Sequence, residues 1–200
     1  MPRTDADVID TLVGIVPGSP LDAIRARRPE ARSQAQATYR ALFEPDEPGD
    51  MTSAERFAVG AFIAGLHGDR ETAAFYAEHL TVAGATVTVG KAVDAAIAEA
   101  AARGPYGHYP GGPLTRENTD GPTYRPSAST RGALGPRLAA AFAHAHLLVF
   151  HPRDAQPAAL QALLDAGWST TAVVTLSQIT AFLSFQVRVL AGLRTLAGRT

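Results

Sequence analysis

The longest apolar stretch of the chain lies near its C-terminus, between Trp168 and Leu196. No charged residue occurs from Ala166 through Val187, and apolar side chains fall on nearly every side of the expected helix. A helix that is apolar all round is buried on most sides, by its own chain or by another subunit. The helix would be roughly 40 Å long, and Ser169 is placed to cap its first turn. Polar residues interrupt the apolar run and argue against a membrane span: Thr175, Ser177, Gln178, Thr180, Ser184 and Gln186. The pattern predicts the central helix of an all-α, soluble domain.

The first third of the sequence predicts three short helices. Apolar positions between Val8 and Val16 mark the first, which Thr4 or Asp5 would open and the PGSP at 17–20 would end. Ser19 is placed to cap the second, with Pro20 at its first position. A third is expected from about residue 30 to residue 43. We treat residues 1–48 as a helical extension and residues 49–200 as the main domain.

The main domain opens with a clear helix start, the capping box Thr52-Ser53-Ala54-Glu55. Its helix is expected to run to Leu66, followed by helices at about 71–82 and 89–103. The segment ATVTV at 85–89 consists largely of residues typical of strands, but the sequence offers it no partner strand.

Residues 103–130 have no helical period and contain many glycines and prolines. A loop of this length inside a compact domain is typical of a functional lid or of an arm that reaches a neighbour. After it, Gly135-Pro136 predicts the start of a helix that ends near Phe150. A short helix at 157–165 then leads into the C-terminal helix.

The amino-acid composition excludes several kinds of chemistry but does not identify the reaction or ligand. The chain has no cysteine, so thiol nucleophiles, disulfides and cysteine metal sites are excluded. A net charge of −1 argues against a nucleic-acid or anionic-membrane binder. Arginines near residues 25–32 are interleaved with acidic residues, which favours a solvated face over a phosphate-binding patch. The N-terminal MPRTDADVID lacks an apolar signal core, so we expect a cytoplasmic protein.

The C-terminal half resembles a known family. The HPRD at 151–154 and the following PAALQALLDAGWSTTAVVTLSQITAFLSFQVRVLAGL are similar to the carboxymuconolactone decarboxylase and alkylhydroperoxidase D superfamily, closest to its peroxidase-related branch. Gln186 and Arg188 stand near the place of the family's Asn-Arg pair. MTSAERFAVGAFIAGLHGD, at 51–69, is similar to the helix before the family's Cys-x-x-Cys motif. The resemblance covers about residues 51–102 and 136–196. It implies an alkylhydroperoxidase D-like helical bundle that oligomerises through its long helices.

The family's catalytic residues are not carried over. Its thiol peroxidases use a glutamate, two cysteines three residues apart and a histidine four residues after the second cysteine. Aligning that pattern without gaps places Phe57 at the glutamate, Asp69 and Thr72 at the cysteines, and Tyr76 at the histidine. A shift by three residues brings His79 to the histidine position but restores no other group. Glu55 is explained by its capping box.

The corner where the family's active site would lie retains four polar residues: His67, Asp69, Tyr76 and His79. These are the candidate catalytic residues, with a histidine as general base and the others in support. A metal site is not expected, because it needs three or four converging ligands. His144 and His146 point about 200° apart on a helix and cannot share an ion. No serine-histidine-acid triad, phosphate loop or cofactor motif has usable spacing.

Arg188 is the candidate ligand-binding residue. It follows a long uncharged helix and shares one helical stripe with Ser177 and Ser184. A buried guanidinium there would need a carboxylate, a carbonyl or a bound anion as partner. A structural salt bridge or extension of the side chain to solvent is the simpler alternative.

Two classes of function remain open. One is a small-molecule enzyme or binder without thiol peroxidase activity that uses the superfamily's pocket, with the four polar residues of the corner between 67 and 79 and with Arg188. The other is a catalytically silent structural partner of a homo- or hetero-oligomer, which assembles with itself or with a cysteine-bearing relative. For either, we expect a homodimer or higher oligomer through the C-terminal helix, because Phe182, Leu183, Phe185, Val187, Val189 and Leu190 should not all fit into one subunit's core.

Overall fold

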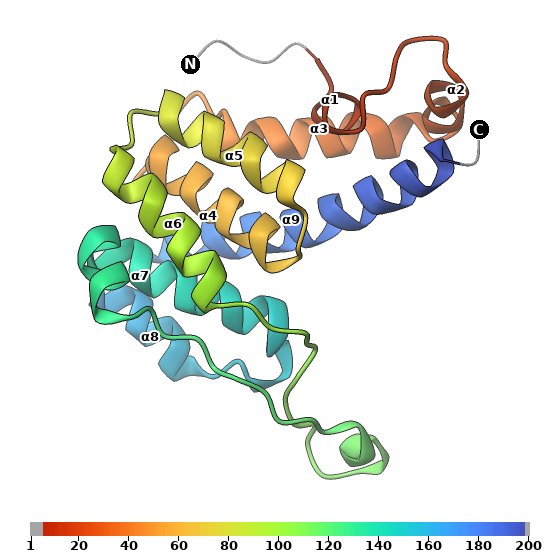
Figure 1. The fold of residues 1–200 in the computed structure, drawn as a ribbon. Coiled ribbons are helices and arrows are strands. Elements are labelled where there is room, and N and C mark those ends of the chain that lie inside the picture. The colour runs from red at the N-terminus through yellow and green to blue at the C-terminus, as the bar shows by residue number, and fades with distance from the viewer. Residues whose placement is uncertain (1–5, 199–200) are drawn as a thin grey trace.

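The computed structural model describes residues 6–198 and shows an all-α protein (Figure 1). Within that range there are nine α-helices, two short 3-10 helices and no strand. In chain order they are α1 (Val8–Val13), α2 (Pro20–Ala26), α3 (Pro29–Phe43), α4 (Ser53–Leu66), α5 (Arg70–Val82), α6 (Val87–Glu99), η1 (Pro113–Glu117), α7 (Ala128–Phe150), η2 (Pro152–Asp154), α8 (Pro157–Asp165) and α9 (Thr170–Ala197).

The helix starts predicted from hydroxyl residues are confirmed. Thr52 and Glu55 form the reciprocal capping box of α4: Glu55 N donates to Thr52 Oγ1 at 3.2 Å, and Thr52 N donates to Glu55 Oε2 at 2.9 Å. Ser19 caps α2, and Ser169 caps α9. These caps satisfy backbone N–H groups that have no partner inside the helix.

Three local expectations need correction. Residues 85–89 form no strand, because Thr86 caps α6 and the valines that follow build its first turn. Helix α7 begins at Ala128, since Ser127 caps it, and Pro136 starts its second part after Gly135 breaks the helix with φ 75° and ψ 167°. Thr4 and Asp5 lie outside the described residues, and the observed cap of α1 is Asp7.

Helix α9 is the centre of the fold and packs against α1, α2, α3, α4, α7 and α8. Its own chain covers more of it than the sequence suggested. Phe182, Leu183, Val187 and Leu190 are all buried, because α1, α2 and α3 cover the side expected to be free. Phe185 remains 46% exposed. The N-terminal helices therefore contribute to the same hydrophobic core as the rest of the chain.

Two helices, α7 and α9, are long and apolar enough to cross a membrane by length and composition. Half of the most apolar window of each is buried within the chain. Gly135 also divides α7, so its two parts do not form one straight rod.

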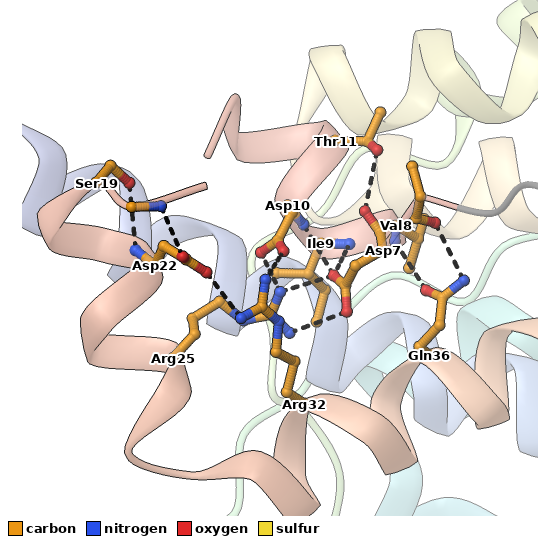
Figure 2. A network of polar contacts seen from close by, with 12 residues as sticks. Asp7, Val8, Ile9, Asp10, Thr11, Ser19, Asp22, Arg25, Arg32 and Gln36 are labelled. Carbon is orange, nitrogen blue, oxygen red and sulfur yellow. Dashed lines mark hydrogen bonds and ion pairs between the residues drawn. The ribbon is translucent and has the colours of Figure 1, made fainter. Parts of the chain in front are cut away.

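An ion-pair network joins the N-terminal helices (Figure 2). Arg25 is only 8% exposed and pairs with both Asp7 and Asp10. Arg32 pairs with Asp10 and, at 2.8 Å, with Asp22. The predicted solvated face is therefore wrong for Arg25, which holds α1 against α2.

Residues 103–127 form an arm that extends away from the helical body, with η1 near its tip (Figure 1). The last three residues of the predicted loop, 128–130, already belong to α7. The base of the arm is fixed to the end of α7, where Tyr106 N donates to Phe150 O at 2.6 Å. His151 lies between Asp154 Oδ2, at 3.1 Å, and Pro122 O, at 3.0 Å. His151 directly follows α7, whereas Pro122 lies in the segment of the arm that returns to the body. The His151 ring therefore joins that segment to the helical body.

Candidate functional site

The candidate site is a cavity of about 590 Å³ between the end of α4, the end of α7 and the middle of α9. Its apolar walls include Leu148, Val149 and Phe150 from α7. Gly104 and Pro105, at the base of the arm, close one side. Its polar side chains are His67, Ser177, Thr180, Ser184 and Arg188. Apolar walls with a few converging polar groups are typical of small-molecule sites.

His67 is the C-cap residue of α4, and its ring points toward α9. Nε2 of the ring lies 3.2 Å from Oγ of Ser184, which is 117 residues away in the sequence. Burial, and then the positive charge of Arg188, lower the pKa of His67 below its ordinary value. The ring is therefore neutral at pH 7, with one nitrogen free to accept a proton.

Arg188 lines the same cavity, one helical turn after Ser184. Of the alternatives left open for Arg188, the structure shows the side chain extended to solvent: it is exposed, and its Nη1 donates to the carbonyl of Ser184. An arginine has five N–H donors, so further donors remain for a ligand. The stripe of Ser177, Ser184 and Arg188 predicted from the sequence does face one cavity.

Asp69 has a structural position next to the cavity. Its Oδ1 accepts from Thr72 N at 3.1 Å as the cap of α5, and its Oδ2 pairs with Arg194 at 2.8 Å. Partial burial raises the pKa of Asp69, but the bonds from Thr72 and Arg194 outweigh it, and the pKa lies below its usual value. Asp69 is an ionised helix cap rather than a proton donor at neutral pH.

Tyr76 and His79 lie elsewhere. Tyr76 is fully buried, and its hydroxyl donates to Gln186 Oε1 at 2.7 Å. His79 packs on Phe57 and Phe75, with ring centroids 5.2 and 4.3 Å away. Nine helical residues separate the start of α5 from His79, which is roughly 14 Å along the axis. Of the four candidates, only His67 lines this cavity. His67 and Asp69 do lie together in a neighbouring hollow of about 560 Å³, which Arg188 also lines, whereas Tyr76 and His79 line neither.

Part of this site is predictable from the sequence. The sequence pattern predicts that Ser177, Ser184 and Arg188 share one stripe of a helix, and that His67 lies at a helix corner. The spacing of these residues does not show that the stripe and the corner face each other. The walls from Phe150 and Pro105 were missed entirely. They depend on how the base of the arm folds back on α7, which is a long-range contact.

No cluster of three or more potential metal-ligating side chains is found in residues 6–198. His144 and His146 are both buried on α7, and burial lowers the pKa of each, to about 4 for His146. His146 packs beside Tyr124 and Phe150. Both therefore serve the core as neutral rings.

A second hollow, of about 680 Å³, lies between α3 and the opposite side of α9. Its lining is apolar or uncharged and includes Ala35, Leu42, Phe182 and the exposed ring of Phe185. Ala181 lines both this groove and the polar cavity. Helix α9 is thus the wall between the two.

Comparison with known protein families, with curated proteins and with solved structures finds no match for this chain.

Proposed function

We propose that this protein binds a small organic molecule with an acidic head group in the cavity between α4, α7 and α9. The observation that carries the proposal is the convergence of His67, Ser184 and Arg188 on one mostly apolar cavity of about 590 Å³. A guanidinium recognises a carboxylate through parallel N–H donors. The hydroxyl and the imidazole supply further hydrogen bonds, and Leu148 and Phe150 accept an apolar body.

The resemblance to alkylhydroperoxidase D-like proteins supports the same place for a site, since His67 lies at the corner where that family's chemistry would occur. We propose the chain as a cysteine-less protein of that kind, with its N-terminal helices as an addition. Thiol peroxidase chemistry is not part of the proposal, because the chain has no thiol to attack a peroxide.

Isothermal titration with benzoate tests the proposal. We expect saturable binding that weakens at least tenfold in Arg188→Ala, because the charge-assisted pair is lost. Arg131→Ala, an exposed arginine on α7, is the matched control and should bind as the parent does. Absence of saturable benzoate binding, or equal binding by both variants, would contradict the proposal.

A catalytically silent role in an assembly is the second candidate, and the groove between α3 and α9 favours it. Val174, Ala181 and Phe185 form an exposed stripe without charge along α9. Such a stripe is typical of a surface that another chain covers. For assembly with itself, this role requires the protein to be a dimer or a larger multiple in solution, whether or not it binds a small molecule.

A further inference from the structure

The hydroxyl of Ser184 differs from the other hydroxyls in the body of α9. Thr175, Ser177, Thr180 and Thr195 each donate to the carbonyl four residues earlier, at distances of 2.8 to 3.2 Å. This is the usual way in which a helix satisfies a serine or threonine. Ser184 instead pairs with Nε2 of His67, across the interface between α4 and α9.

The imidazole beside Ser184 is in the state that a base needs. Its surroundings favour the neutral ring, because burial and the cation of Arg188 both oppose protonation. A serine hydroxyl within hydrogen-bond reach of a neutral imidazole is the arrangement that activates serine as a nucleophile. The pair faces a cavity with room for a small substrate.

Arg188 supplies positive charge at the same place. Its guanidinium reaches back over one helical turn to the carbonyl of Ser184, which holds it beside the hydroxyl. Its remaining N–H donors can stabilise negative charge that develops on a substrate oxygen.

From this geometry we infer that Ser184 is a nucleophile, with His67 as its general base, for acyl transfer from small carboxylic esters. The inference rests on the proposed binding cavity and adds a reaction to it. It assigns Arg188 two uses: binding an acidic head group, and stabilising the oxyanion of an ester.

The steps balance without a further reagent. Oγ of Ser184 attacks the ester carbonyl carbon while its proton moves to Nε2 of His67, giving a tetrahedral oxyanion beside Arg188. The C–O bond to the alcohol then breaks, and the leaving oxygen takes the proton from His67. Water attacks the acyl-serine in the same way, with His67 again accepting and returning the proton, and the acid is released.

The full chain incubated with p-nitrophenyl acetate and p-nitrophenyl butyrate tests the inference. We expect release of p-nitrophenolate, a mass gain of one acyl group per chain, and location of that group on Ser184 by peptide mass spectrometry. In Ser184→Ala, the peptide that contains position 184 should carry no acyl group. His67→Gln should slow acylation by about a hundredfold, which is the size of a general-base contribution.

Thr175→Ala removes a hydroxyl of α9 that bonds within its own helix and lies off the cavity lining, so it should react as the parent does. Thermal melting of each variant shows whether it is folded. Benzoate titration on the same samples separates the two proposals. Benzoate binding without acylation of Ser184, or acylation of another residue in its place, overturns the nucleophile alone. Absence of both binding and acylation overturns both.

Discussion

The hydroxyl of Tyr76 donates a 2.7 Å hydrogen bond to Oε1 of Gln186 and so ties α5 to α9 inside the core. Both residues are fully buried. Burial, followed by the nearby Tyr39, raises the pKa of Tyr76 far above its ordinary value, and the hydroxyl stays neutral. This is the geometry of a structural contact rather than of an acid-base group.

Tyr76→Phe should therefore destabilise the protein without affecting the cavity. Loss of the hydroxyl leaves the Gln186 side chain without its donor, and we expect a loss of about 1 to 3 kcal/mol in the free energy of unfolding. Urea denaturation measures it, with Tyr109→Phe on the arm as control. An unchanged unfolding free energy, or a large loss of benzoate affinity in the folded variant, would contradict this assignment.

The buried His146 should make stability depend on pH. Because its folded pKa is lowered to about 4, the unfolded chain takes up a proton first as the pH falls below the ordinary value of 6.5. Stability is then lost between pH 6.5 and pH 4, by roughly 2 to 3 kcal/mol at pH 4.5 from this residue. Between pH 7 and pH 4.5, the unfolding free energy of His146→Gln should therefore fall by that much less than that of the parent protein, as urea denaturation at the two pH values would show. If the variant keeps the parent's full pH dependence, His146 does not cause the loss of stability. His108→Gln, on the exposed arm, should follow the parent.

Arg25 should be the most sensitive residue of the N-terminal network. Arg25→Met leaves the half-buried carboxylates of Asp7 and Asp10 without their shared partner, and removing one member of a buried pair costs about 3 kcal/mol. Urea denaturation measures it. Arg27→Met, at an exposed position nearby, should change stability by less than about 0.5 kcal/mol. Equal effects of the two variants would mean that the network contributes nothing.

Assembly through α9 can be tested by light scattering at micromolar concentration. We expect a dimer or a multiple of it, with an interface above about 2,000 Å² that includes the exposed ring of Phe185. Phe185→Lys should shift the protein toward the monomer. Val82→Lys, an exposed apolar residue on α5, should not. A 20.9 kDa monomer for the parent chain would exclude this interface.

Peroxide reduction with a dithiol reductant should remain at background. Thiol peroxidases need a thiolate, and this chain lacks cysteine. Peroxide consumption in a coupled assay measures it, with heat-denatured protein as the blank. Clear turnover that depends on one side chain would indicate a different peroxide chemistry.

The local features of this fold were predictable because short-range signals set them. Thr52 and Ser169 cap their helices through bonds to residues only three positions away. Thr86 also caps its helix through a bond to a residue three positions away. The valines after it nevertheless favoured a strand in the sequence, because β-branched residues have a high intrinsic preference for strands.

The candidate site was predictable only in part. Tyr76 bonds to a residue 110 positions away, and His67 to one 117 positions away. Such pairs depend on which faces of α4, α5 and α9 pack together. The apolar surface of α9 suggested a second subunit, whereas α1, α2 and α3 of the same chain cover much of it.

Helix α9 also constrains how this protein can change in length during evolution. Each residue turns a helix by about 100°, so one residue inserted near Thr175 would rotate the rest of α9 relative to its neighbours. Ser184 would leave His67, Gln186 would leave Tyr76, and Phe182 would leave the core in the same event. The tip of the arm, around η1, contributes no residue to the hydrophobic core. Insertions and deletions in relatives are therefore expected in the arm, while the spacing from Ser169 to Arg188 stays fixed.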